Sequence, residues 1–180
     1  MKQLLTALCC LTLLSIPALA QKRAAHQARA NAAMTDQQFL ELAAQTDMVE
    51  ANLGQLAQNV SDNQQVKDYA QTLLTDHTKD FDDLHAAAQQ ASLMVPDAID
   101  AAHNKSMIDP FQKLKGAAFD RKYVQEMVAG HTHALEIYKK EAEDAQNPAI
   151  KSYAENAIPV LEKHLASAKD LEHAKGAKKK

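Results

Sequence analysis

Three histidines are the residues of this chain best suited to chemistry, because each falls within an apolar repeat of helical spacing. His77, His131 and His164 stand where the alternating three- and four-residue spacing places buried side chains. Glu50, next to Val49 in a fourth such repeat, adds a carboxylate. Imidazole nitrogens combined with a carboxylate suit transition metals. The sequence therefore predicts these four residues as candidate metal ligands, with zinc, copper or iron as the candidate ion.

The spacing of these residues along their helices predicts that they lie at a similar height. Each histidine is about 15 to 17 residues from the nearest hairpin loop, and Glu50 is about 11 residues from the first loop. At about 1.5 Å per residue the three imidazoles lie near the middle of their helices. Asp76 points roughly 100° away from His77 around the helix, which favours a supporting or surface role over a ligand role.

An alternative interpretation stays open at this point. A single histidine in a helical core is commonly a polar group that is hydrogen-bonded to its neighbours. The three histidines would then be core polar groups without an ion. The paired Glu-x-x-His motifs of di-iron carboxylate proteins are missing from this sequence, as are a nucleophile elbow and a phosphate-binding loop. An enzymatic function is expected only if a bound metal keeps an open position.

Helices must position these side chains, and their boundaries can be read from the sequence. Thr35 followed by Gln38 has the pattern of a capping box, and "SDN" at 61–63 separates the first helix from the second. The second helix ends before "SLMVPD" at 92–97, a third spans about 118–145, and a fourth follows "QNP" at 146–148. The predicted fold is all-α.

The arrangement of the four helices is predicted from an internal repeat and from one long connection. "NQQVKDYA" at 63–70 resembles "NPAIKSYA" at 147–154, which suggests two similar helical hairpins. About 26 residues, with a short helix over "DAIDAAHNKS", join the second helix to the third. This connection either crosses the length of the bundle, as in ferritin-like folds, or folds over one end.

The first twenty residues have the pattern of a secretory signal peptide. Lys2 is followed by an apolar run over 4–16 and by Ala18-Leu19-Ala20, a small-residue cleavage site. The run is too short to span a bilayer. We therefore predict a signal peptide over 1–20 cleaved near Ala20, a flexible leader over 21–34, a helical domain over 35–173, a basic disordered tail over 174–180, and a periplasmic or secreted location.

Composition narrows the chemistry further. Cys9 and Cys10 both fall within the signal peptide, so the exported chain has no thiol to form a disulfide or bind a metal. The whole chain has a formal net charge of −3, and removal of Lys2 makes it more negative, which argues against nucleic-acid binding. A homodimer is left open by the sequence.

Four segments carry a resemblance to a known family. They are "FLELAAQTDMVEANLGQLA", "VKDYAQTLLTDHTKDFDDL", "GAAFDRKYVQEMVAGHTHALEIYKKEA" and "IKSYAENAIPVLEKHLASAKDL". Over about residues 36–173 the chain resembles DUF4142, a bacterial exported domain-of-unknown-function family that is often labelled as a periplasmic or outer-membrane protein. The resemblance falls on the following residues: Glu50, Asp76, His77, Phe119, Asp120, His131, Pro159 and His164. An Asp-His pair of the family pattern is Gly130-His131 here, so one supporting acid is missing.

The resemblance implies a ferritin-like antiparallel four-helix bundle without a settled activity. Two functional hypotheses follow. The chain is either an exported metal-binding bundle that stores, buffers or senses a transition metal, or a non-catalytic structural or stress-associated bundle that holds no metal.

Overall fold

The computed structural model describes residues 34–177, and the prediction of an all-α fold is confirmed for them. Four long helices carry the domain: α2 (Asp36–Val60), α3 (Gln64–Ala91), α5 (Gly116–Asp144) and α6 (Pro148–Ala177). No β-strand occurs between residues 34 and 177. The predicted signal peptide, the predicted leader up to residue 33 and the last three residues of the predicted tail lie outside the described residues.

The helix boundaries follow from the capping residues. Thr35 accepts a hydrogen bond from the backbone of Gln38, whose side chain accepts one from the Thr35 backbone, so the predicted capping box is confirmed. Asn63 caps α3 through the Gln65 backbone N–H. Helix α3 ends at Ser92, which has a left-handed backbone conformation with φ of 56°. Helix α6 continues to Ala177, past the predicted end of the domain at residue 173.

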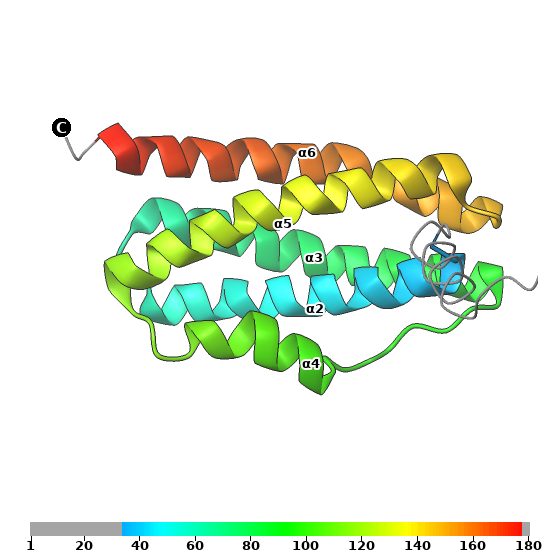
Figure 1. The fold of residues 1–180 in the computed structure, drawn as a ribbon, viewed down its shortest axis with the longest axis horizontal. Coiled ribbons are helices and arrows are strands. Elements are labelled where there is room, and N and C mark those ends of the chain that lie inside the picture. The colour runs from blue at the N-terminus through cyan, green and yellow to red at the C-terminus, as the bar shows by residue number, and fades with distance from the viewer. Residues whose placement is uncertain (1–33, 178–180) are drawn as a thin grey trace, which may run out of the picture. The chain divides into compact units, whose positions relative to one another are not determined.

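The four helices pack in pairs. Helix α2 contacts α3 and α5, and helix α6 also contacts α3 and α5 (Figure 1). Apolar side chains form two clusters along the helices: one includes Phe39, Leu84, Leu135 and Leu161, and the other includes Leu53, Leu73, Met127 and Ala168. Each of the three histidines falls in sequence between the residues of these two clusters. The histidine layer is therefore enclosed by hydrophobic core on both sides.

The long connection crosses the length of α2, which decides between the two routes left open by the sequence. Near its start, the backbone N–H of Met94 donates to the Gln37 side chain, close to the beginning of α2. At its end, Gly116 lies beside Asp62, just after α2 finishes. Figure 1 shows the connection running beside α2 between these points. It contains α4 (Ala101–His103), a π-helix (Asn104–Ile108) and a 3₁₀-helix (Asp109–Phe111), which places a short helix within the predicted segment.

The three- and four-residue spacing of Leu42, Thr46, Val49, Leu53, Leu56 and Val60 predicts one buried stripe along α2, and this prediction is partly wrong. Leu42, Thr46, Leu56 and Val60 are half-buried, whereas the buried face runs through a neighbouring arc. That face includes Phe39, Ala43, Asp47, Glu50, Leu53 and Ala57. The reason is that α2 has α3 on one side and both α5 and the connection on others, so its buried arc is wide.

Asp120 and Phe119 carry part of the family resemblance, and both are buried at the start of α5. The buried Asp120 carboxylate accepts a hydrogen bond of 2.6 Å from the Ser61 hydroxyl. Phe119 is fully buried and stacks on Tyr123. The Asp120–Ser61 hydrogen bond joins the start of α5 to the loop between α2 and α3 and gives the buried carboxylate a donor.

Candidate metal centre

The structure brings the four predicted ligands together, with one contributed by each long helix. Glu50 comes from α2, His77 from α3, His131 from α5 and His164 from α6. All four side chains are buried, with exposed fractions between 1 and 5%. One ring nitrogen from each of the three histidines falls within a group whose members lie no more than 4.8 Å apart. Helical periodicity predicted the buried positions of the three histidines, and Glu50 was predicted from its place beside Val49.

Each imidazole is held by a hydrogen bond from the nitrogen that points away from the centre. His77 Nδ1 lies 2.8 Å from Asp47 Oδ1, and His164 Nε2 lies 2.8 Å from Asp76 Oδ2. His131 Nδ1 lies 2.9 Å from the carbonyl oxygen of Met127. Carboxylate and carbonyl oxygens accept hydrogen bonds, so each of these ring nitrogens carries a proton and donates it. In a neutral imidazole the other nitrogen then holds a lone pair.

The remaining ring nitrogens face one another and Glu50. His77 Nε2 lies 3.1 Å from Glu50 Oε2, and His131 Nε2 lies 3.5 Å from the same oxygen. His131 Nε2 is also 3.3 Å from His164 Nδ1. Within the part of the chain that the structure describes, His77 Nε2 and Glu50 Oε2 have no hydrogen-bond partner although both are buried. Four electron-rich atoms thus converge on one place.

Such a convergence is unfavourable unless positive charge lies among these atoms. Buried acceptors that face one another without a donor lose their hydration and repel one another. Either added protons or a metal ion would satisfy them. An ion with bonds of about 2.0 Å in tetrahedral geometry places its ligand atoms about 3.3 Å apart. The separations of 3.1, 3.3 and 3.5 Å are close to that value.

The pKa values describe how the centre distributes charge without an ion. Burial alone would raise the pKa of Glu50, but the neighbouring histidines, His131 first, outweigh it and lower the pKa to about 2. Burial disfavours the protonated form of His77, yet Glu50 and Asp47 raise its pKa well above the usual value. Burial lowers the pKa of His164 to about 4. Without an ion, His77 is therefore protonated on both ring nitrogens and positively charged between two carboxyl groups, while His164 is neutral.

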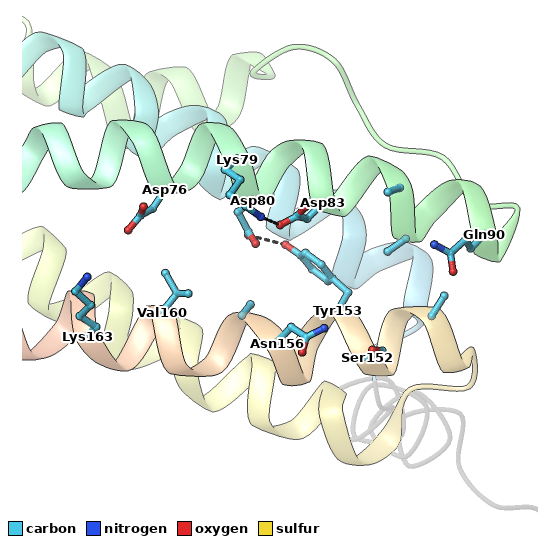
Figure 2. Close-up of a pocket in the computed structure, with 14 residues that line it drawn as sticks. Asp76, Lys79, Asp80, Asp83, Gln90, Ser152, Tyr153, Asn156, Val160 and Lys163 are labelled. Atoms are coloured by element: carbon cyan, nitrogen blue, oxygen red, sulfur yellow. Dashed lines mark hydrogen bonds and ion pairs between the residues drawn. The ribbon is translucent and has the colours of Figure 1, made fainter.

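A hydrogen-bonded group of Asp80, Tyr153 and Tyr138 lies near the centre, on the side of α3 and α6. The Tyr153 hydroxyl donates to Asp80 Oδ2 over 2.7 Å, and the Tyr138 hydroxyl lies 3.3 Å from that of Tyr153. Figure 2 shows Asp76 and Asp80 along α3, with Asp80 hydrogen-bonded to Tyr153 of α6 and Asp76 lying opposite Val160 and Lys163. These residues line a groove of about 700 Å³ between α3 and α6. Burial raises the pKa of Asp80 and raises that of Asp47 to about 7. The centre therefore has carboxyl groups near it that can hold protons.

Sequence reasoning missed Asp47 and assigned Asp76 to no particular histidine. Asp47 precedes Glu50 by three residues on the same face of α2, and this spacing is the signal that could have found it. Asp76 does have a supporting position, but it supports His164 on α6 instead of the adjacent His77. The partner of His131 is the backbone carbonyl of Met127, which every residue type has, so the sequence could not indicate it.

The other histidines of the described chain do not join this group. His103 and Asp100 form a local hydrogen bond at the start of α4, where the same aspartate caps the helix. His85 lies 3.6 Å from Asp97, and His133 lies on an exposed part of α5. Of the residues within 34–177, only His77, His131 and His164 form a cluster of three or more metal-ligating side chains.

Comparison with known proteins yields one family. A family model described as "Domain of unknown function (DUF4142)" matches residues 21–171. No curated protein and no solved structure matches the chain. Over the described residues, none of the helices combines the length and apolar character needed to cross a membrane.

Proposed function

The chain belongs to the DUF4142 family, and from the geometry of its centre we propose that it is an exported helical protein that binds one divalent transition-metal ion. His77, His131, His164 and Glu50 are the proposed ligands. The observation that carries the proposal is the convergence of four buried acceptor atoms, each histidine being held by a hydrogen bond on its outer nitrogen. Such outer partners are typical of metal-binding histidines, because they orient the ring and fix its tautomer.

Charge balance supports a divalent ion. The centre contains the Glu50 carboxylate, and the Asp47 carboxyl group is bonded to His77. Buried negative charge is costly when uncompensated, and a dication would offset the charge of Glu50 and, where it is ionised, that of Asp47. The ion would take the place of the proton that His77 carries in the metal-free protein. Imidazole with carboxylate suits zinc, copper and iron, and the ligand set does not choose among them.

The helix packing supports a fold for the protein, and the signal-peptide pattern supports a cellular location. Two contacting helix pairs and one connection along α2 support a ferritin-like four-helix bundle of two hairpins. The signal-peptide pattern over 1–20 supports export to the periplasm or out of the cell. With one carboxylate and three imidazoles enclosed by core, the proposed role is storage, buffering or sensing of a metal.

The position of His77 between two carboxyl groups favours a second candidate function, a structural one without a metal. The two ring nitrogens of His77 lie 2.8 Å from Asp47 and 3.1 Å from Glu50, so a protonated His77 would have a carboxyl partner on each nitrogen without any ion. The domain would then be a structural or stress-associated bundle with a buried polar layer. This alternative predicts a protein that is indifferent to metals.

Metal analysis of the exported protein, purified without a histidine tag, tests the proposal. We expect about one ion per chain, and a rise in melting temperature when zinc, copper or iron is added to the metal-free protein, because an ion that binds only the folded state stabilises it. His77→Ala should abolish the rise, whereas His85→Ala should keep it. Protein that contains no metal and gains no stability from any of the three ions would support the structural alternative.

A further inference from the structure

A small cavity lies beside the proposed metal centre, between α2, α5 and the long connection. It has a volume of about 90 Å³. A water molecule takes about 30 Å³ in the liquid, so the cavity has room for roughly three such molecules. Its lining includes Val49, Glu50, Met107, Phe111, Met127 and Gly130.

Glu50 belongs both to the centre and to the wall of this cavity. Its Oε2 atom faces His77 and His131. Its Oε1 atom lies on the side of Gly130, where a Cβ atom added to the glycine would be 3.8 Å from it. Since the side chain is only 5% exposed, the cavity brings solvent-sized molecules to a carboxylate that is otherwise enclosed.

Apart from Glu50, the inner wall of the cavity is mainly apolar, and the cavity is small. Val49, Phe111 and Met127 are buried and apolar, so the interior offers few hydrogen-bond partners apart from Glu50. Towards the outside, Lys122 forms an ion pair with Glu126 and lies over the Phe111 ring. Gly130 is exposed at this opening, and its lack of a side chain leaves the approach to Glu50 clear. The π-helix over Asn104–Ile108 contributes Met107 and Ser106.

We propose that this cavity admits a small exogenous ligand, of two or three heavy atoms, to an open position on the bound ion. This proposal rests on the proposed metal centre and deepens it. The three imidazoles are held from outside by Asp47, Met127 and Asp76, whereas Oε2 of Glu50 faces His77 and His131 and has no hydrogen-bond partner among residues 34–177. In the proposed mode of binding, the Glu50 carboxylate turns and exposes the ion on the cavity side. The centre is thus one that binds small donor molecules or anions, in contrast to a closed structural site.

Cobalt(II) and azide test this proposal with the full exported chain. Cobalt(II) is a visible-absorbing substitute for zinc, and azide is a linear anion of three atoms that fits the cavity. We expect azide to change the visible spectrum of the cobalt protein in a saturable way. In Gly130→Leu, whose side chain would enter the cavity, we expect azide affinity to fall at least tenfold while cobalt still binds.

The controls separate this proposal from the one on which it rests. Ala86→Leu places the same side chain in the groove between α3 and α6, and it should leave azide binding unchanged. Cobalt binding with no spectral response to azide would overturn the cavity proposal and leave the metal centre standing. An equal response in wild type and Gly130→Leu would also overturn it. Failure of cobalt to bind the wild-type protein would overturn the metal centre and, with it, the cavity proposal.

Discussion

His131 Nε2 and His164 Nδ1 lie 3.3 Å apart, and the opposite nitrogen of each ring already donates a hydrogen bond outward. With both rings neutral, two lone pairs face each other across this distance. A buried arrangement of this kind gains stability from a cation placed between the rings. Both residues come from the α5–α6 pair, whereas the Asp76 carboxylate that holds His164 comes from α3.

Removal of one of these imidazoles should weaken metal binding strongly. For His131→Gln and His164→Gln we expect the dissociation constant for zinc to rise by at least about 100-fold, since loss of a supporting group alone typically costs 10- to 100-fold. Competition with a chromophoric chelator measures it. His133→Gln, on the same helix and exposed to solvent, is the matched control and should bind as wild type. Unchanged affinity in both core variants would contradict the assignment.

Asp47 should contribute to metal affinity without touching the ion. The carboxylate accepts a hydrogen bond from the Nδ1–H group of His77. We expect Asp47→Asn to lower zinc affinity by about 10- to 100-fold, because an amide can present its NH₂ group to the ring in place of an oxygen. Isothermal calorimetry at fixed pH gives the value. Asp83→Asn serves as the control, because Asp83 is exposed and pairs only with Lys79 within the described chain. Equal losses in the two variants would mean that long-range charge, and not the hydrogen bond, is responsible.

Glu141 should make the stability of the domain fall as the pH rises. Burial, followed by the nearby Asp36 carboxylate, raises the pKa of Glu141 to about 7 in the folded protein. A raised carboxyl pKa means that the folded state holds the proton more tightly than the unfolded state. This stabilising effect is complete below the unfolded pKa of about 4.5 and is lost as the pH passes 7.

The variant Glu141→Gln isolates this effect. We expect it to be more stable than wild type by about 1 to 3 kcal/mol at pH 8, and nearly equal to wild type at pH 4. Urea unfolding at several pH values measures the difference. Glu143→Gln, which changes an exposed residue two positions away, should show no comparable pH dependence. A Glu141→Gln stability difference that does not vary with pH would show that this carboxyl group is not protonated in the folded state.

Gly54 should be required for the close approach of α2 and α3. A Cβ atom at this position would lie 2.8 Å from the carbonyl oxygen of Ala70. Because this oxygen belongs to the backbone, a change of side-chain rotamer cannot remove the clash. We expect Gly54→Ala to destabilise the domain by about 1 to 3 kcal/mol in urea unfolding. Gly130→Ala is the matched control, since it gains helix propensity with an ordinary contact of 3.8 Å. A gain in stability from both substitutions would contradict the tight α2–α3 contact.

Much of the domain could be predicted from local patterns. The capping box at Thr35, the loop at 61–63 and the stop before Ser92 were found because caps and breakers act on the backbone within a few residues. The heights of His77, His131 and His164 followed from helix rise alone, which is why the sequence already grouped them.

The sequence by itself determined that the three histidines face the core at a similar height, and to which family the chain belongs. Tertiary structure alone decided which side chain supports which histidine: Asp47 of α2 supports His77, and Asp76 of α3 supports His164 of α6. The physical reason is that helical periodicity specifies the direction of a side chain about its own axis, whereas its partner depends on which neighbouring helix occupies that direction. The same holds for the cavity beside Glu50, whose outer wall comes from a connection with no repeating pattern.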